Sequence, residues 1–324
     1  MKTILVTGGV GFIGSNFCKL LLKIRPTWKI INVDCVTKYC NESTINKELK
    51  NSKYIFYKCD ILDKNSIFNI FQKEKPEIVV NFAAESHVDR SIDNSDIFFK
   101  TNVLGTLVLL EACKKYGIER FHQVSTDEVY GDLQFDSKDM FDEKSKLNPS
   151  SPYASSKASA DLLALSFYRT FGIPITISRC SNNYGPYQFP EKLIPSIIFH
   201  ALKNEKISIY GNGKNIRDWI FVEDHCLGIL KVLEHGLPGE IYNLSSNYEI
   251  DNLSLAKKIL HSLNKSESLI VFTEDRKGHD LKYSLNSSKA KSVLQWNPVT
   301  CFEKGLIATI EWYKENIQWL NDCL

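Results

Sequence analysis

Four side chains in the middle of the chain have the types and spacing for acid–base chemistry. Tyr153 and Lys157 stand four positions apart in a stretch of helical period, so we expect them on one face of a helix. An ammonium beside a phenol stabilises the phenolate and lowers the tyrosine pKa, which predicts Tyr153 as a base for a substrate hydroxyl. Asp127 and Glu128 are adjacent, and two carboxyl groups held close in a cleft can become one acid and one base. Taken alone, the first pair also fits a surface helix and the second fits a solvated loop.

Three glycines near the N-terminus predict a dinucleotide site. Gly8, Gly11 and Gly14 lie in TGGVGFIG, between a strand-like segment and a stretch of helical period. Glycine there lets backbone N–H groups and a helix N-terminus approach a pyrophosphate. Asp34 ends the next apolar run, at the offset of about 20 residues expected for a carboxylate that binds the adenosine ribose. A carboxylate repels a 2′-phosphate, so the sequence favours NAD over NADP.

The elements that must position these residues alternate between short apolar runs and longer helical stretches. This alternation is typical of βαβ units, which build a parallel sheet covered by helices on both faces. Runs such as ILV and IVV are continuously apolar, as strands buried on both sides are. The expected fold class is α/β, a Rossmann-type doubly wound parallel sheet with a smaller C-terminal substrate-binding lobe. The predicted strands are Ile4–Thr7, Ile30–Val33, Tyr54–Lys58, Ile78–Phe82, Phe121–Ser125 and Ile175–Ser178, and the predicted helices are Ile13–Ile24, Lys64–Glu74, Asp96–Tyr116 and Tyr153–Phe171.

The pattern changes after Cys180. The segment SNNYGPYQFPE contains two prolines and predicts a loop, followed by a helix over Ile194–Leu202 and a glycine-rich turn. The remaining elements are shorter and lose the βαβ rhythm. We expect residues 1–180 to form an NAD-binding Rossmann domain to which later segments return. Residues 181–324 then form mainly a second, ligand-binding lobe over the carboxyl edge of the sheet.

Composition excludes several classes of protein. The 324 residues carry 40 basic and 38 acidic side chains, a net charge of +2, which argues against nucleic-acid binding as the main activity. Nine cysteines without a CxxC pair or a Cys/His cluster predict reduced thiols and no metal site. No basic leader precedes the first strand, and no apolar stretch approaches the ~18 residues of a membrane span. We expect a cytoplasmic protein that has neither a membrane nor a nucleic acid as partner.

The motifs together resemble a known family. Tyr153 and Lys157, with Ser125 and Thr126 at a strand end, are similar to the catalytic set of short-chain dehydrogenase/reductases, and the glycine spacing is similar to that of their extended branch. Further segments, in the right order from residue 3 to about 285, resemble the nucleoside-diphosphate-glucose 4,6-dehydratases. They are STDEVYGD at 125–132, AAESHVDRS at 83–91, SPYASSK at 151–157, SNNYGPYQFPEKLIP at 181–195, YGNGKNIRDWIFVEDH at 210–225 and the GHD of RKGHDLKY at 276–283.

The resemblance implies a mechanism. Tyr153, assisted by Lys157 and Thr126, takes the proton of the C4 hydroxyl while the C4 hydride passes to NAD. Glu128 removes the C5 proton, Asp127 protonates the departing C6 hydroxyl, and the hydride returns to C6. The product is a 4-keto-6-deoxy sugar nucleotide, and NAD stays bound between turnovers. The lobe of residues 181–324 is then expected to bind the nucleotide sugar.

The resemblance also assigns binding residues. The expected NAD-binding set is Gly8, Gly11, Phe12, Ile13, Gly14, Asp34, Thr37, Asp60, Ile61, Phe82, Ala83, Ala84, Thr101, Tyr153, Lys157 and Asn183. The expected substrate-binding set is Ser86, Thr126, Asn182, Lys192, Leu193, Ser208, Tyr210, Arg217, Asn252, Arg276, His279 and Tyr283. Arg217 and Arg276 are predicted to meet the diphosphate, because a guanidinium holds two oxygens at once. Asp89 and Arg90 are interpreted as a structural ion pair with each other.

Two segments depart from the family pattern. CVTKYCNES, residues 35–43, lacks the usual lysine and carries an extra residue, and Lys277 replaces the usual proline before Gly278. Neither change touches the acid, base or hydride machinery. Tyr39 and Cys40 faintly resemble a Tyr-Cys pair in relatives that act on UDP-glucose.

The expected substrate is dTDP-glucose, and the expected pathway is deoxysugar biosynthesis such as that of rhamnose. UDP-glucose remains an alternative substrate, since both kinds of relative share the catalytic residues. A UDP-sugar 4-epimerase is a second alternative, but it has no need of Asp127 and Glu128. A non-catalytic NAD-binding scaffold is a third, and it predicts a damaged site. Relatives pair as homodimers through two long helices per subunit, here Asp96–Tyr116 and Tyr153–Phe171, so we expect a homodimer.

Overall fold

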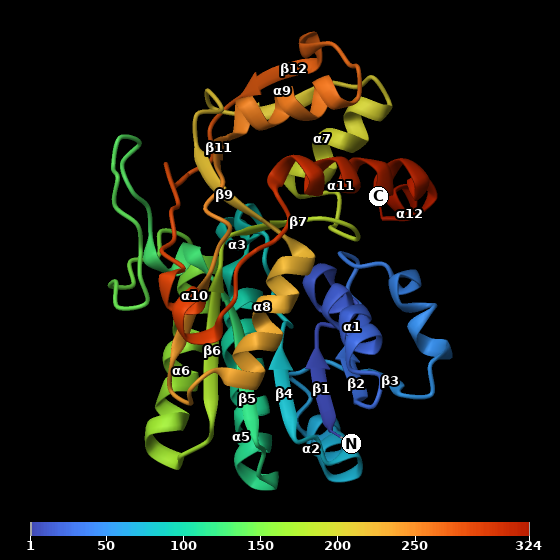
Figure 1. Ribbon diagram of the computed structural model, residues 1–324, viewed down its shortest axis with the longest axis vertical. Coiled ribbons are helices and arrows are strands. Elements are labelled where there is room, and N and C mark those ends of the chain that lie inside the picture. Colours follow the sequence, from blue (N-terminus) through green and yellow to red (C-terminus); the bar gives the residue numbers. More distant parts are fainter. Residues whose placement is uncertain (1, 324) are drawn as a thin grey trace.

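A parallel sheet of seven strands forms the centre of the molecule in the computed structural model, which describes residues 2–323 (Figure 1). The strand order is β3-β2-β1-β4-β5-β6-β10, and every neighbouring pair is parallel. The order reverses between β1 and β4, where open α/β sheets bind ligands. The predicted doubly wound sheet is confirmed. Its strands are β1 (Thr3–Thr7), β2 (Lys29–Asp34), β3 (Tyr54–Lys58), β4 (Ile78–Asn81), β5 (Arg120–Thr126), β6 (Ile175–Cys180) and β10 (Ile241–Leu244).

Helices cover both faces of this sheet, which explains why its strands are so apolar. On β1, Ile4 and Val6 join one hydrophobic core while Leu5 joins the other, because successive side chains point to opposite faces. The first core is completed by α1 (Phe12–Ile24), α8 (Val222–His235) and α10 (Ser288–Leu294). The second is completed by α2 (Lys64–Glu74), α5 (Thr106–Tyr116) and α6 (Pro152–Phe171).

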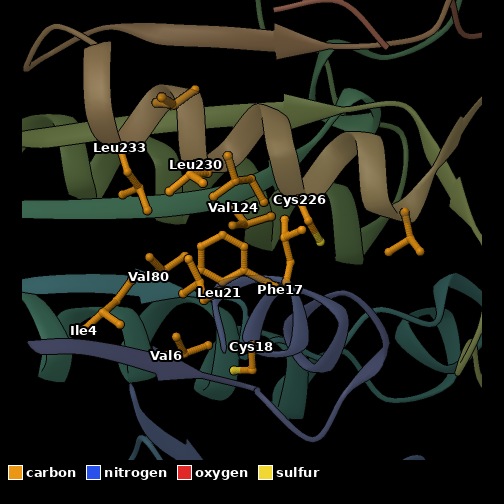
Figure 2. Packing of buried hydrophobic residues seen from close by; sticks show 14 of the residues in the cluster. Ile4, Val6, Phe17, Cys18, Leu21, Val80, Val124, Cys226, Leu230 and Leu233 are labelled. Carbon is orange, nitrogen blue, oxygen red and sulfur yellow. The ribbon is translucent and has the colours of Figure 1, made fainter. Parts of the chain in front are cut away.

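The first core holds the glycine-rich turn of α1 against the sheet. Figure 2 shows Phe17 and Leu21 of α1 facing Cys226 and Leu230 of α8 across the ends of buried strand side chains. Phe17 is fully buried. Burying one side chain of this size contributes about 1.5–3 kcal/mol, so the position of α1 over the sheet is well determined.

The helix predicted over Asp96–Tyr116 is interrupted. It consists of α4 (Ser95–Phe99), the π-helical turn η3 (Lys100–Gly105) and α5. Within η3 the Asn102 amide donates to the Ser156 hydroxyl at 2.8 Å, and its carbonyl oxygen accepts the Glu85 N–H at 2.9 Å. These contacts to other segments hold the wide turn, which periodicity along the sequence cannot reveal. The short helix α3 (Val88–Asp93) precedes α4.

A second lobe lies above the carboxyl ends of the strands in Figure 1. Its helices α7 (Leu193–Leu202), α9 (Asn252–Ser262), α11 (Phe302–Glu315) and α12 (Ile317–Asp322) share a hydrophobic core. Two small sheets complete it, one of β8 (Ile207–Tyr210) and β12 (Ile270–Thr273), the other of β7 (Asn182–Tyr184), β9 (Ile216–Phe221) and β11 (Glu249–Asp251). The chain returns to the main sheet in α8, β10 and α10. Within residues 2–323, no helix has the length and apolar character needed to cross a membrane.

Candidate active site

A cavity of about 1050 Å³ opens where the carboxyl ends of the central strands meet the second lobe. Its size suits a small-molecule ligand with a bound cofactor. All the residues that the sequence assigns to cofactor, catalysis and substrate line this one cavity, although their roles remain predictions. They are Gly8, Gly11, Phe12, Ile13, Gly14, Asp34, Thr37, Asp60, Ile61, Phe82, Ala83, Ala84, Ser86, Thr101, Thr126, Asp127, Glu128, Tyr153, Lys157, Asn182, Asn183, Lys192, Leu193, Ser208, Tyr210, Arg217, Asn252, Arg276, His279 and Tyr283.

The turn between β1 and α1 has room only for glycine. Gly8 has a φ of +71°, and a Cβ there would lie 2.7 Å from the backbone nitrogen of Ala83. A Cβ on Gly14 would lie 2.2 Å from the carbonyl oxygen of Gly8. Helix α1 then begins at Phe12 with no side-chain cap and no acidic residue in its first turn. Its open N–H groups and positive dipole end fit a pyrophosphate.

Asp34 ends β2 beside this turn. Its carboxylate accepts the N–H groups of Val10 at 2.9 Å and Val36 at 2.8 Å, which fixes its orientation at the cavity wall. Burial raises its pKa, against these backbone hydrogen bonds. The glycine turn and a fixed carboxyl at the end of the next strand together fit an adenine dinucleotide without a 2′-phosphate.

Asp127 and Glu128 begin η4 (Asp127–Tyr130), immediately after β5. The Thr126 hydroxyl donates to Oδ1 of Asp127 at 3.1 Å, while Oδ2 is buried without a hydrogen-bond partner among residues 2–323. Burial and the neighbouring Glu128 raise the pKa of Asp127 well above its usual range, which favours the protonated form of this carboxyl. Burial also raises the pKa of Glu128, but Arg276, Lys192 and Arg217 oppose that rise. The two acids therefore sit in unequal surroundings, as an acid and a base require.

Tyr153 and Lys157 lie on the first two turns of α6, which Ser151 caps by accepting the Ala154 N–H at 3.1 Å. Both side chains are deeply buried, with exposed fractions of 8% and 4%. The Lys157 ammonium donates to the carbonyl oxygen of Val124 at 2.7 Å.

The sequence-based expectation that Lys157 brings the pKa of Tyr153 toward neutrality is wrong for this structure. Burial raises that pKa well above its ordinary value, and Glu128 adds to the rise. The Thr126 hydroxyl lowers it, but by less than burial raises it. Burial is the largest influence on the phenol, while the Lys157 ammonium is directed to the Val124 carbonyl.

The two arginines that are predicted to bind the diphosphate make different contacts in the structure. Arg217 donates to the carbonyl oxygen of Asp280 at 2.9 Å, and its guanidinium lies 4.4 Å from the centre of the Tyr283 ring. Arg276 lies in the loop after β12, where its Nε is 3.6 Å from Oδ1 of Asp89 and makes no hydrogen bond within the described chain. Arg276 is therefore the freer of the two to take a phosphate.

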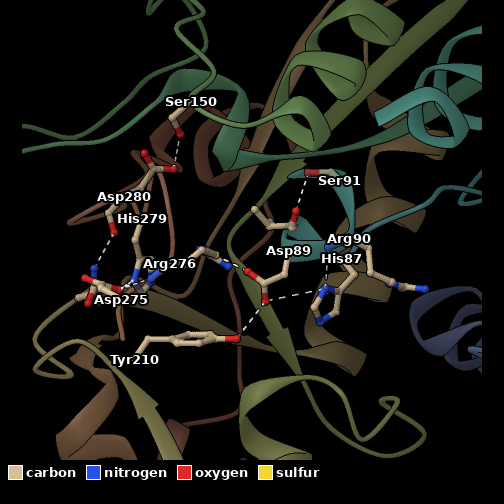
Figure 3. Close-up of polar contacts among 12 residues, drawn as sticks. His87, Asp89, Arg90, Ser91, Ser150, Tyr210, Asp275, Arg276, His279 and Asp280 are labelled. Atoms are coloured by element: carbon tan, nitrogen blue, oxygen red, sulfur yellow. Dashed lines mark hydrogen bonds and ion pairs between the residues drawn. The ribbon is translucent and has the colours of Figure 1, made fainter. Parts of the chain in front are cut away.

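The mouth of the cavity carries a network of charged side chains (Figure 3). Asp89 lies at its centre, 3.3 Å from the Tyr210 hydroxyl that donates to it and 4.0 Å from Nδ1 of His87. Arg90 turns away and binds Glu191 at 3.0 Å. The expected ion pair between Asp89 and Arg90 is wrong, because neighbours on a short helix point in different directions and each finds a partner from another segment.

Sequence reasoning missed several residues of this wall. His87, Glu191 and Tyr39 line the cavity, and the Arg90 guanidinium lies 3.2 Å from the centre of the Tyr39 ring. Burial and the nearby Lys192 lower the pKa of His87 to about 4, so the ring is neutral. The motif AAESHVDRS contains the signal for His87, but the resemblance assigns site roles only within the first half of that motif.

Several predicted polar residues present unpaired atoms. Asn182 and Asn252 each have a buried side-chain carbonyl oxygen that finds no partner within residues 2–323. Asn183, by contrast, is engaged, since its amide donates to the carbonyl of Ser181 at 3.0 Å and its oxygen bonds the ring of His225 at 2.9 Å. Buried polar atoms are normally paired, so the first two indicate a polar ligand.

Known proteins are similar to this chain in sequence and in structure. The model of the GDP-mannose 4,6 dehydratase family matches residues 5–309. The chain belongs to this family. It is 42% identical to a dTDP-glucose 4,6-dehydratase of Escherichia coli, over 98% of this chain and 94% of that protein. The resemblance to nucleoside-diphosphate-glucose 4,6-dehydratases is therefore confirmed.

Two solved structures, one of a dehydratase and one of an epimerase, are similar to this chain. The dTDP-glucose 4,6-dehydratase of Streptomyces venezuelae, with NAD and TYD bound, superposes with a TM-score of 0.96 at 41% identity, covering 99% of this chain and 100% of that one. A UDP-glucose 4-epimerase of Thermotoga maritima, with UDP-glucose, reaches a TM-score of 0.90 at 31% identity, covering 97% and 99%. Because both activities occur on this fold, the side chains of the site must distinguish them.

Proposed function

We propose that this chain is a dehydratase that converts dTDP-glucose to dTDP-4-keto-6-deoxyglucose and water with a bound NAD. The observation that carries the proposal is the buried, unpaired Oδ2 of Asp127 beside Glu128 in the cavity that also holds Tyr153. An epimerase needs only to oxidise C4 and reduce it again, whereas loss of water needs a proton donor and a proton acceptor on neighbouring carbons. The dTDP-glucose 4,6-dehydratases to which the chain is similar support the same choice.

The residues of the chain then divide the proton transfers. Bound NAD supplies the oxidation and reduction, taking a hydride from C4 and returning it to C6. Tyr153, with Thr126 and Lys157 beside it, takes the proton of the C4 hydroxyl. Glu128 removes the C5 proton, which the neighbouring ketone has made acidic. Asp127, whose pKa burial raises, delivers its proton to the departing C6 hydroxyl.

The remaining contacts are proposed from the placement of the side chains. Arg217 and Arg276 bind the diphosphate, and Lys192 and Leu193 lie along the nucleotide. Burial lowers the pKa of Lys192, and Glu191 and Glu128 oppose that change. The glycine turn and Asp34 hold the NAD adenosine and pyrophosphate. The boundary near residue 180 separates the NAD-binding part from the sugar-nucleotide part, with α8, β10 and α10 returning to the first.

We further propose a cytoplasmic homodimer in deoxysugar biosynthesis such as that of rhamnose. The nine cysteines are free, as in a reducing compartment. The α4–α5 and α6 segments expose large apolar side chains that a second copy of the chain would cover. They are Ile97, Phe99, Leu104, Leu162 and Phe171.

The test is to incubate the purified protein, without added cofactor, separately with dTDP-glucose and with UDP-glucose, and to follow the product mass. Loss of one water from dTDP-glucose is expected. Loss from UDP-glucose alone would reassign the nucleobase. No loss from either after NAD is added, with conversion of UDP-galactose to UDP-glucose, would instead establish an epimerase.

A further inference from the structure

A buried carboxylate that the proposed reaction does not use lies one helical turn beyond Lys157. Asp161 is fully buried, and its Oδ2 accepts hydrogen bonds from the Ser125 hydroxyl and from Nε of Arg179, both at 3.0 Å. Its Oδ1 has no hydrogen-bond partner among the described residues. The pair with Arg179 therefore uses only one of the two carboxylate oxygens of Asp161.

Tyr153, Lys157 and Asp161 form a row along α6, because residues four apart stack on one helix face. The row forms hydrogen bonds with two consecutive residues of β5. The Lys157 ammonium donates to the carbonyl oxygen of Val124, and Asp161 accepts from the hydroxyl of Ser125. The next residue of β5 begins the catalytic segment, so these bonds set the position of α6 relative to the acids.

The charge of Lys157 needs a counter-ion at this depth. Burial lowers its pKa, and Asp161 is the largest opposing influence, followed by Cys180. The Cys180 thiol on β6 does not supply the charge, because burial and Asp127 raise its pKa and keep it neutral. The carbonyl of Val124 offers a dipole only. Of the two groups whose charge opposes the effect of burial on Lys157, Asp161 is the carboxylate.

We propose that Asp161 is a positioning residue: its carboxylate keeps the Lys157 ammonium charged and seated on the Val124 carbonyl, so that Tyr153 works beside a fixed positive charge. Arg179 and Ser125 in turn hold Asp161. Arg179 is itself buried and lies 4.8 Å from the centre of the Tyr130 ring, so it cannot move to Lys157 or to solvent without breaking packing. The inference rests on the proposed function, since it assigns Asp161 to the same reaction.

The test compares two substitutions with opposite expected effects. Asp161→Asn keeps the shape and the hydrogen-bond acceptor but removes the charge, so the Lys157 pKa falls by about one unit or more. Arg179→Gln removes the other cation that pairs with the Asp161 carboxylate, so the Lys157 pKa rises. Both are read from the ¹⁵N NMR titration of ε-labelled lysine, with the Lys157 signal identified by its absence in Lys157→Met.

The rate of water loss gives the second readout. Because Lys157 must be protonated, the alkaline limb of the kcat profile is expected to move down in pH for Asp161→Asn and up for Arg179→Gln. Glu74→Gln is the matched control. Glu74 is a buried carboxylate of α2, outside the cavity, and it pairs with Lys29 at 2.6 Å. This substitution is expected to lower Tm and leave both the Lys157 titration and the pH profile unchanged.

An unchanged Lys157 pKa in folded Asp161→Asn would overturn the proposal. If that variant does not fold, Arg179→Gln carries the test, and a Lys157 pKa that does not rise there would overturn the proposal. The NMR titration does not depend on turnover. A wild-type protein that fails to dehydrate any sugar nucleotide, yet shows the Asp161-dependent shift, would refute the proposed function and leave the charge assignment standing.

Discussion

At the floor of the cavity Lys157 is almost wholly buried and bonds a backbone carbonyl, whereas at the mouth Arg276 faces Asp89 across 3.6 Å and a third of the Asp89 side chain is exposed. The floor is thus held by groups that the substrate does not replace. The mouth is held by carboxylates whose place a phosphate can take, since both accept charge-assisted hydrogen bonds. The floor is preorganised for proton transfer, and the mouth adjusts to the molecule that binds.

The largest effect is expected at the floor, from Tyr153→Phe. Loss of the phenol removes the base for the first step, so water loss should fall by about 10²–10⁴-fold and no reduced nicotinamide should appear on mixing with substrate. Absorbance and product mass measure both. Tyr130→Phe is the control, because this phenol is buried and bonds Asn243 at 2.9 Å outside the cavity. Comparable loss in both variants would mean that packing, not proton transfer, is affected.

Glu128→Gln should slow water loss by a similar factor but leave the first step intact. Reduced nicotinamide should then accumulate when substrate is added, because the C5 proton has no acceptor. Stopped-flow absorbance distinguishes this variant from Tyr153→Phe. If neither variant accumulates the reduced form, the role of Glu128 is misassigned.

At the mouth, Arg276→Ala should raise KM by about 10–100-fold and change kcat less, since a hydrogen bond to a charged group contributes about 1.5–3 kcal/mol. Steady-state kinetics at two salt concentrations measure this. Lys277→Ala, the neighbouring cation, is the control. An equal effect of both would indicate general attraction by positive charge instead of a defined phosphate contact.

Asp127→Asn should abolish dehydration and yet raise Tm by a few degrees at neutral pH. Burial raises the pKa of Asp127, so the folded chain keeps a proton that the unfolded chain releases. The stability from this carboxyl is therefore full at acid pH and is lost as pH rises from the usual carboxyl range through the raised pKa. Calorimetry should show the Tm advantage of the variant vanish at acid pH, with exposed Asp136→Asn unchanged throughout. A lower Tm at neutral pH would contradict the destabilising effect of this buried carboxyl.

The smallest effect is expected from Asp89→Asn. A partly exposed ion pair contributes less than about 1 kcal/mol, so Tm should hardly move. Freeing Arg276 and removing a negative charge near the diphosphate should lower KM a few-fold. Asp93→Asn, at the end of the same helix, is the control. A large rise in KM would show instead that Asp89 holds the substrate itself.

Local pattern was enough to predict the floor. Tyr153 and Lys157 share a helix face, and Asp127 follows a buried strand, so short-range spacing indicated where each side chain lies. The mouth was beyond such reasoning, because Asp89 meets Arg276 from a distant segment and Arg90 turns to Glu191 instead of its neighbour. The pKa of Tyr153 was also mispredicted, since the depth of burial around a phenol depends on the packing of the whole fold.

The π-helical turn η3 has a consequence for how one helix can serve two surfaces. A wider turn inserts residues relative to an α-helix and so changes the angular phase of the residues after it. Asn102, within the turn, reaches Ser156 beside the cavity, while Leu109 and Leu110 of α5 point into the core under the sheet. Removing one residue from η3 would leave a regular helix. Asn102 could then no longer face Ser156 while Leu109 and Leu110 face the core.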